Sequence, residues 1–370
     1  MTSMRQTCAE SAVERIDVSV YRVPTEMPES DGTLTWDKTT LVIVEATAGG
    51  TRGLGYTYAD TATARVIRDL LAEVVQGRDA MAVPGSWTAM LRAVRNLGRV
   101  GVTAMAIAAV DGALWDLKAR LLDRPLVQLL GATRSAVPIY GSGGFTSYSP
   151  QRLSEQLAAW VTQDGCQWVK MKVGSEPVQD LQRVRAARSA IGAAGLFVDA
   201  NGAYSRKQAL RFAEQFAELD VSWFEEPVSS DDLNGLRLLR DRAPPAMEIA
   251  AGEYGYEPFY FRRMLQAGAV DVLQADATRC CGITGFLRAA AIADAYMVPL
   301  SSHTAPALHL HVCCAAPRLR HIEWFHDHVR IERTLFDGAP VPKQGLIRPD
   351  LSRAGLGLEL RGADAERFAA

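Results

Sequence analysis

The stretch LFVDANG at residues 196–202 is an apolar run that leads into a carboxylate, Asp199. The arrangement recurs twice further along the chain, where WFEEP contains Glu225 and IAAGE ends in Glu253. The three carboxylates are 26 and 28 residues apart, about the length of one strand plus one helix. Equivalent strand ends of a parallel barrel open into the same mouth, so this spacing predicts that the three carboxylates converge.

A cation is needed to hold three converging carboxylates together, because they would otherwise repel one another. All-oxygen ligation favours a hard divalent ion, and Mg²⁺ is the ion we expect. The sequence therefore predicts a metal-dependent barrel enzyme in which Asp199, Glu225 and Glu253 are the metal ligands.

These acids belong to a longer repeat that begins near residue 137. Short apolar runs alternate with helix-like segments over about 200 residues, which is typical of a (β/α)8 TIM-type barrel. A doubly wound open sheet is the alternative, but no glycine-rich phosphate fingerprint follows the first strand. The eight predicted strands contain VPIYG, WVKMKVG, LFVDANG, WFEEP, EIAAGE, VLQADAT, VPLSSHT and HIEWF.

The sequence before the barrel mixes both kinds of secondary structure. RIDVSVYRV and TTLVIVEATAGG have strand patterns, whereas residues 61–75 and 100–122 have the apolar periodicity of helices. We expect an N-terminal α+β domain with lid loops at 1–132 and the barrel catalytic domain at 133–345. The remaining segment, 346–370, is expected to return to the N-terminal domain.

One polar segment of the N-terminal domain has two interpretations. PTEMPESDGTLTWD at 24–37 is interrupted by proline and glycine, which fits a surface loop. It equally fits a lid over a neighbouring active site. Its acidic side chains, Glu26, Glu29 and Asp31, would suit a hydroxylated substrate better than an aromatic one.

Composition excludes several classes of partner. The chain has 370 residues and a formal net charge of −2, without a basic run, which argues against nucleic acid and anionic membrane surfaces. The N-terminus has no apolar segment of the signal-peptide type, and no apolar run is long enough to span a bilayer. We therefore expect a cytoplasmic protein that acts on a small molecule.

The cysteines do not suggest a second metal site. None of the six has CxxC spacing, so a zinc site is not expected. Reduced and mostly buried thiols are the prediction. The six are Cys8, Cys166, Cys280, Cys281, Cys313 and Cys314.

Two lysines end the second predicted strand, in WVKMKVG. Lys170 and Lys172 are separated by one residue, so both face the barrel interior. Each ammonium group lowers the pKa of its neighbour, and burial lowers the pKa of both. A neutral lysine able to accept a proton is therefore favoured. Two surface lysines on an edge strand are the alternative, but a barrel has no edge strand.

Polar residues also fall at the last three strand ends. Asp276 in the sixth strand and His303 after the seventh would form a dyad in which the carboxylate fixes the imidazole tautomer. The alternative is a core histidine bonded to a backbone carbonyl. Glu323 in HIEWF is predicted to be a protonated acid that donates to a developing oxyanion.

The order KxK, DxN, EEP, GE, D and SSH resembles the enolase superfamily, specifically its mandelate racemase subgroup. The resemblance includes ALWDLKARLL in the N-terminal domain and RAGLGLEL near the C-terminus. It implies a modified (β/α)7β barrel with an N-terminal α+β capping domain, one Mg²⁺ per subunit and a homo-oligomer. The implied metal ligands are the same three acids, Asp199, Glu225 and Glu253.

The resemblance also assigns catalytic roles. It implies that Lys172 is the base on one face of the substrate and that Lys170 lowers the pKa of Lys172. His303, oriented by Asp276, would be the acid or base on the other face. Glu323 would be the electrophile opposite the metal.

Substrate contacts are predicted from position. Asn201 and Ser142 align with residues that contact the substrate carboxylate in the family, and Arg279 near the sixth strand end would contact a polyol acid. Tyr56, with Tyr58, is expected to influence substrate stereochemistry. The run FHDH at 325–328, which contains His326, either is a packed, solvated loop or binds a substrate hydroxyl or donates a proton.

The resemblance implies removal of the proton α to a carboxylate to give an enediolate, followed by β-elimination of water from a sugar acid. The product would be a 2-keto-3-deoxy acid. The alternative is a racemase or epimerase of a 2-hydroxy acid that uses the same two bases. A Schiff-base aldolase built on Lys170 or Lys172 is disfavoured because imine chemistry needs no cation site. A non-catalytic barrel is disfavoured by the complete set of acids and bases.

Overall fold

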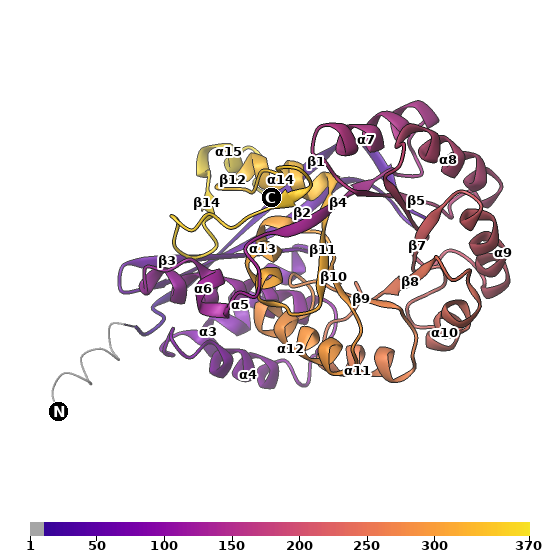
Figure 1. The fold of residues 1–370 in the computed structure, drawn as a ribbon. Coiled ribbons are helices and arrows are strands. Elements are labelled where there is room, and N and C mark those ends of the chain that lie inside the picture. Colours follow the sequence, from indigo (N-terminus) through magenta and orange to yellow (C-terminus); the bar gives the residue numbers. More distant parts are fainter. Residues whose placement is uncertain (1–10) are drawn as a thin grey trace.

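The computed structural model describes residues 11–370, and a closed barrel of parallel strands is its centre (Figure 1). The strands follow one another around the barrel in sequence order, and pairing of β11 with β4 closes it. The (β/α)8 prediction is confirmed, and the open-sheet alternative is wrong. The strands are β4 (Val137–Gly143), β5 (Trp168–Lys172), β6 (Gly195–Asp199), β7 (Val221–Glu225), β8 (Glu248–Ala251), β9 (Val272–Ala275), β10 (Leu300–Ser302) and β11 (Leu319–Phe325).

Each barrel strand is followed by a helix, and these helices cover the outside of the barrel (Figure 1). They are amphipathic or apolar elements that bury one face against the strands. A helix, α14, also follows the eighth strand. The helices are α7 (Pro150–Thr162), α8 (Pro177–Ala190), α9 (Arg206–Ala217), α10 (Leu233–Arg242), α11 (Pro258–Gln266), α12 (Gly282–Ala295), α13 (Pro306–Ala315) and α14 (His326–Leu335).

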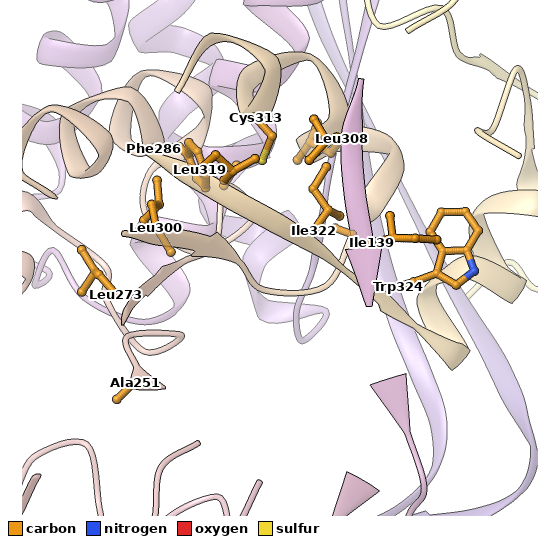
Figure 2. Packing of buried hydrophobic residues seen from close by; sticks show 14 of the residues in the cluster. Ile139, Ala251, Leu273, Phe286, Leu300, Leu308, Cys313, Leu319, Ile322 and Trp324 are labelled. Atoms are coloured by element: carbon orange, nitrogen blue, oxygen red, sulfur yellow. The ribbon is translucent and has the colours of Figure 1, made fainter. Parts of the chain in front are cut away.

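The main hydrophobic core lies between the barrel strands and this helical layer. Figure 2 shows Leu308 and Cys313 of α13 beside Leu319 and Ile322 of β11, and all four side chains are buried. The five cysteines in the described part of the chain are buried and form no disulfide bonds, as predicted. Cys8 lies outside the described residues. No helix within residues 11–370 is long and apolar enough to cross a membrane.

The N-terminal domain is a three-stranded antiparallel sheet packed on helices, with its own hydrophobic core. The long helix α5 lies across β3, where Gly53 and Gly55 let the two backbones approach closely. A Cβ at Gly55 would lie only 2.2 Å from the carbonyl oxygen of Ala109. The elements are β1 (Arg15–Ser30), β2 (Thr35–Ala48), β3 (Thr51–Tyr58), α2 (Ala62–Val66), η1 (Ile67–Leu71), α3 (Ala72–Val75), α4 (Val83–Ala93), α5 (Val102–Leu121) and α6 (Leu126–Leu130).

The segment 24–37 is a β-hairpin rather than an irregular loop. β1 and β2 pair up to Ser30 and Thr35, with a shift of register between Pro24 and Glu29. The hairpin tip rests on the β4–α7 loop, where the hydroxyls of Ser30 and Thr146 are 2.6 Å apart. Proline and glycine therefore mark a bulge and a turn here, not the absence of strands.

The C-terminal segment contacts both parts of the molecule. β13 (Leu346–Ile347) pairs with β4, and β14 (Glu359–Leu360) pairs with β12 (Phe336–Asp337). Further along, Ala369 forms a bridge with Tyr21 of β1. The segment thus returns to the N-terminal domain.

Candidate active site

Three buried carboxylates meet at the carboxyl ends of neighbouring strands. Asp199 ends β6, Glu225 ends β7 in register with it, and Glu253 follows β8 after Gly252. One oxygen of each lies within 4.8 Å of the others, and no other such cluster of potential metal ligands occurs in residues 11–370. The all-oxygen donor set fits a hard divalent cation.

Cationic side chains surround this carboxylate triad. Lys172 Nζ lies 2.5 Å from Asp199 Oδ2, and Lys170 Nζ lies 2.5 Å from Glu225 Oε1. Arg279 approaches Glu253 Oε1 at 3.1 Å. The other oxygen of Glu253 has no hydrogen-bond partner among the described residues, so it retains lone pairs for a ligand. The triad is thus partly neutralised by the chain and still open to a cation.

The two lysines share the interior face of β5, as predicted, but the expected neutral state is not supported. Burial and the charge of Lys170 lower the pKa of Lys172, whereas the carboxylates of Asp199, Glu253 and Glu225 together raise that pKa more. The net shift is upward, and the pKa of Lys170 is raised as well, because Glu225 and Glu323 outweigh burial. Pairing with carboxylates, invisible in the sequence, reverses the expected direction.

His303 and Asp276 form the predicted pair, with 2.8 Å between His303 Nδ1 and Asp276 Oδ2. Burial raises the pKa of Asp276, but the hydrogen bond and charge of His303 outweigh it, so the net pKa falls and the carboxylate stays ionised. Its other oxygen accepts hydrogen bonds from the backbone and hydroxyl of Thr278. His303 Nε2 lies 3.3 Å from Glu253 Oε2 and 4.0 Å from Glu323 Oε2.

The neighbours of Glu323 favour an ionised carboxylate over the predicted protonated acid. Lys170 Nζ lies 2.8 Å away, Ser142 donates to Oε1, and the backbone N–H of Thr304 donates to Oε2. Burial raises the pKa of Glu323, but the charges of Lys170 and His303 lower it further than burial raises it. All of these neighbours stabilise a carboxylate.

A cavity of about 410 Å³ opens above the triad, between the barrel mouth and the β1–β2 hairpin. Its volume is in the usual range for a small-molecule site. Five of the predicted site residues line it: Lys172, Asn201, Glu253, Arg279 and His303. The hairpin contributes Asp31, Leu34, Trp36, Lys38, Thr39 and Thr40.

The hairpin is therefore a lid over the cavity of its own chain. Trp36 packs edge-on against Phe145 of the barrel, and Thr39 hydrogen-bonds Asp327 of α14. The carbonyl of Pro24 accepts from Arg330 at 2.7 Å. These contacts hold both strands of the lid against the barrel.

Two families match the chain. The Enolase C-terminal domain-like family matches residues 152–365, and the mandelate racemase / muconate lactonizing enzyme N-terminal domain family matches residues 15–131. The chain belongs to the mandelate racemase subgroup of the enolase superfamily.

Relatives in this superfamily cover most of the chain. A mandelate racemase/muconate lactonizing enzyme-like protein from Rubrobacter xylanophilus has a TM-score of 0.95 and 55% identity, over 97% of this chain and 100% of that one. The 3,6-anhydro-alpha-L-galactonate cycloisomerase of Streptomyces coelicolor is 32% identical over 84% of this chain and 88% of its own. The L-talarate/galactarate dehydratase of Salmonella typhimurium is 29% identical, over 90% of this chain and 87% of its own. A crystal structure of that dehydratase with Mg and L-lyxarohydroxamate covers 97% of this chain and 93% of that one, with 28% identity and a TM-score of 0.88.

Three of the five predicted substrate-contact residues do not line the cavity. Ser142 is buried beneath it and donates to Glu323. Tyr56 is fully buried and donates to Glu332 at 2.6 Å. His326 faces α7 and the outer base of the lid, with Nε2 3.4 Å from Glu26. The predicted substrate contacts of these three side chains are therefore corrected to structural contacts.

Two cavity residues of this enolase-superfamily protein, Tyr58 and the FHDH residue His328, were predicted only alongside Tyr56 and His326, and two more were not predicted as substrate contacts. His328 lies two residues beyond His326 and Tyr58 two residues beyond Tyr56, and both line the cavity. Lys38 of the lid and Tyr254 beside Glu253 line it as well. In both motifs the predicted residue and the cavity residue are two positions apart. Either member of each pair fits its motif, and this ambiguity was visible in the sequence.

Proposed function

We propose that this protein is a Mg²⁺-dependent acid-sugar dehydratase that converts an aldonate or aldarate of four to six carbons into a 2-keto-3-deoxy acid. The observation that carries the proposal is that Lys172, which contacts Asp199, and His303, which contacts Glu253 and Asp276, line one cavity at the carboxylate triad. Relatives that are sugar-acid dehydratases and cycloisomerases support acid-sugar chemistry.

Asp199, Glu225 and Glu253 are the residues that would hold Mg²⁺. The fit rests on three buried oxygen donors and on Oε2 of Glu253, which accepts no hydrogen bond from residues 11–370. When bound, the ion stabilises the negative charge that develops on the substrate carboxylate as the α-proton leaves. Magnesium in the crystal structure of the Salmonella dehydratase supports the same choice of ion.

Proton transfer falls to two residues of the chain. Lys172 accepts the α-proton at Nζ, which requires the neutral amine; pairing with Asp199 opposes that state. Engagement of Asp199 by a cation would weaken its hold on the ammonium. His303 donates from Nε2 to the departing β-hydroxyl, which leaves as water, and Asp276 balances the charge of the imidazolium at Nδ1.

Glu323 completes the far side of the site. Lys170 and the Thr304 N–H hold it as a carboxylate, so it stabilises positive charge on Lys170 and His303 instead of donating a proton. Polar groups of the lid, among them Lys38 and Thr39, line the remainder of the cavity. Asn201 Oδ1 and the Tyr58 hydroxyl of the same cavity have no hydrogen-bond partner within residues 11–370, so a polyhydroxy acid suits the site better than an aromatic acid, which would leave them unpaired.

Isomerisation is the second candidate, because acid-base groups on two faces can also return a proton from the opposite side. The cycloisomerase among the relatives supports keeping it. The test is a screen of mono- and diacid sugars with the Mg²⁺-loaded enzyme, followed by detection of 2-keto acids and of optical rotation. Keto-acid formation from a sugar acid is the expected result. Inversion of 2-hydroxy acids such as mandelate without any keto acid would overturn the dehydratase proposal and favour the isomerase.

A further inference from the structure

One wall of the cavity carries an imidazole that the proposed chemistry does not use. His328, in the first turn of α14, lines the cavity, and its ring stacks on Tyr58 of β3. The ring centroids are 3.4 Å apart with an interplanar angle of 11°. Phe325 contacts the imidazole edge-on at 5.0 Å, so the ring orientation is fixed from two directions.

The hydrogen bonding of His328 indicates which of its ring nitrogens carries the proton. The backbone N–H of Ala305 donates to His328 Nδ1 at 3.3 Å. Burial, together with the nearby positive charge of His303, lowers the pKa of His328 well below its usual value, so the imidazole is neutral. A neutral imidazole that accepts at Nδ1 carries its proton on Nε2. Nε2–H makes no hydrogen bond with residues 11–370.

Tyr58 adds a second free donor beside it. Its hydroxyl is buried and has no hydrogen-bond partner among the described residues. Burial and nearby carboxylates raise the pKa of Tyr58 well above its usual value, so the O–H is retained. Buried donors without a partner cost free energy, which a ligand oxygen would recover.

We propose that His328 Nε2–H and Tyr58 O–H together form a hydroxyl-recognition site on the His303 side of the cavity. The ligand is a hydroxyl oxygen of the substrate, which can accept from both donors. This inference rests on the proposed function and deepens it: it names the residues that distinguish a polyhydroxy acid from a simple 2-hydroxy acid. A site built to pair a hydroxyl rejects analogues that lack it.

The ligand hydroxyl is chemically distinct from the groups already assigned. The α-carboxylate belongs at the triad, and the α-proton belongs between Lys172 and His303. His328 accepts from Ala305, two residues after His303 and just before α13, and it stacks on Tyr58 at the end of β3. A chain of hydroxylated carbons extending from the triad past His303 would therefore reach the donor pair.

The test measures binding of a homologous series of acids to the Mg²⁺-loaded protein by calorimetry. Lactate, glycerate, the C4 aldonates and the C5 aldonates, in each configuration, differ stepwise by one hydroxyl or one hydroxylated carbon. Two variants address the donors separately: Tyr58→Phe removes only the hydroxyl and keeps the stacked ring, and His328→Phe removes the imidazole. His326→Phe is the matched control, because it alters the same helix outside the cavity.

We expect the wild-type affinity to rise at one step of the series, and both variants to lose about tenfold at that step, the scale of one hydrogen bond to a buried donor. Lactate affinity should change by less than about twofold, and His326→Phe should follow the wild type. The inference alone would be overturned if the two variants lost the same affinity for every acid. It would also be overturned if Tyr58→Phe and His328→Phe kept the selectivity of the wild type. A wild-type protein that binds none of the acids would overturn the proposed function together with the inference.

Discussion

His303 Nδ1 lies 2.8 Å from Asp276 Oδ2, and Thr278 engages the other oxygen of the same carboxylate through both its backbone and its hydroxyl. The carboxylate is therefore fixed in place and ionised, and it keeps a proton on Nδ1 of the imidazole. Nε2 is then the nitrogen that exchanges protons, and it faces the triad at Glu253. This orientation is what makes His303 a candidate acid opposite Lys172.

Loss of either proton-transfer group should abolish turnover. Lys172→Ala and His303→Ala are each expected to lower kcat at least about a hundredfold, the usual scale for a positioned acid or base. Lys207→Ala, which changes an exposed lysine of α9, is the control. Turnover of the substrate found in the screen, together with α-proton exchange in D₂O, separates the two roles. Near-normal rates in both variants would contradict the two-sided assignment.

Removal of the metal should stop activity without unfolding the protein. Each acid of the triad has a cationic neighbour in the chain, Lys172 for Asp199, Lys170 for Glu225 and Arg279 for Glu253. The metal-free carboxylates are thus not left as unpaired buried charges. After exhaustive chelation we expect no measurable turnover, and circular dichroism should retain the folded spectrum. Full activity in the chelated protein would contradict the metal requirement, and re-addition of Mg²⁺ is the control.

The triad could be predicted from sequence because a barrel repeats one structural unit. Each acid follows an apolar run at the same point of its unit, so spacing alone places Asp199, Glu225 and Glu253 at one mouth. The pairing of Asp276 with His303 was accessible for the same reason, since they lie at the ends of adjacent strands.

The cavity wall could not be predicted in this way. Tyr56 and Tyr58 share one face of β3, and only the point where the strand passes the barrel mouth decides which of them meets the cavity. His326 and His328 are two residues apart on a helix, which turns about 200° between them and places them on opposite sides. That helical phase depends on packing of α14 against the barrel, which the sequence run FHDH does not encode locally.

The ionisation states of the site residues also could not be predicted from the sequence. Two lysines on one strand predict mutual lowering of their pKa values, and an acid in an apolar strand predicts protonation. The structure instead places Lys170 between Glu225 and Glu323, so neighbouring carboxylates raise the pKa of Lys170 and Lys170 lowers that of Glu323. Such pairing joins strands that are distant in sequence.

Lys170 should contribute strongly to stability through this pairing. Lys170→Met leaves Glu225 and Glu323 buried without their cation, and loss of one partner of a buried pair costs about 3–5 kcal/mol. Urea unfolding of the chelated protein measures the loss. Lys170→Met combined with Glu323→Gln should recover part of it, because one of the unpaired charges is then absent. A loss below about 1 kcal/mol would show that the charges are relieved in another way.

Gly55 should be essential for docking of α5 on β3. In Gly55→Ala the new Cβ meets the carbonyl oxygen of Ala109 at 2.2 Å and the backbone nitrogen of Ala113 at 2.2 Å. Backbone cannot rotate away, so we expect a loss of at least about 2 kcal/mol in unfolding free energy, within the range for overpacking. Gly85→Ala in α4 is the control, because its nearest contact is 3.9 Å away and alanine favours helix. Equal stability of the two variants would contradict the close approach.

Glu29 of the lid should make the stability of the protein pH-dependent. The carboxyl is buried, Trp36 donates to one oxygen at 3.0 Å, and the other oxygen has no partner within residues 11–370. Burial, and then the negative charge of Asp327, raise the pKa of Glu29 from 4.5 to about 8. The folded state therefore holds this proton more tightly than the unfolded state. The resulting stabilisation is present below pH 4.5 and is lost as the pH rises to about 8.

Glu29→Gln tests this pH dependence, because glutamine resembles the protonated acid at every pH. The melting temperature of the wild type should fall between pH 5 and pH 9 more steeply than that of the variant, so the variant should be the more stable of the two at pH 9. Differential scanning fluorimetry across this range measures the difference, and Glu73→Gln, an exposed site on α3, controls for the loss of one charge. Parallel melting curves for wild type and Glu29→Gln would mean that Glu29 ionises in the folded lid as freely as in the unfolded chain.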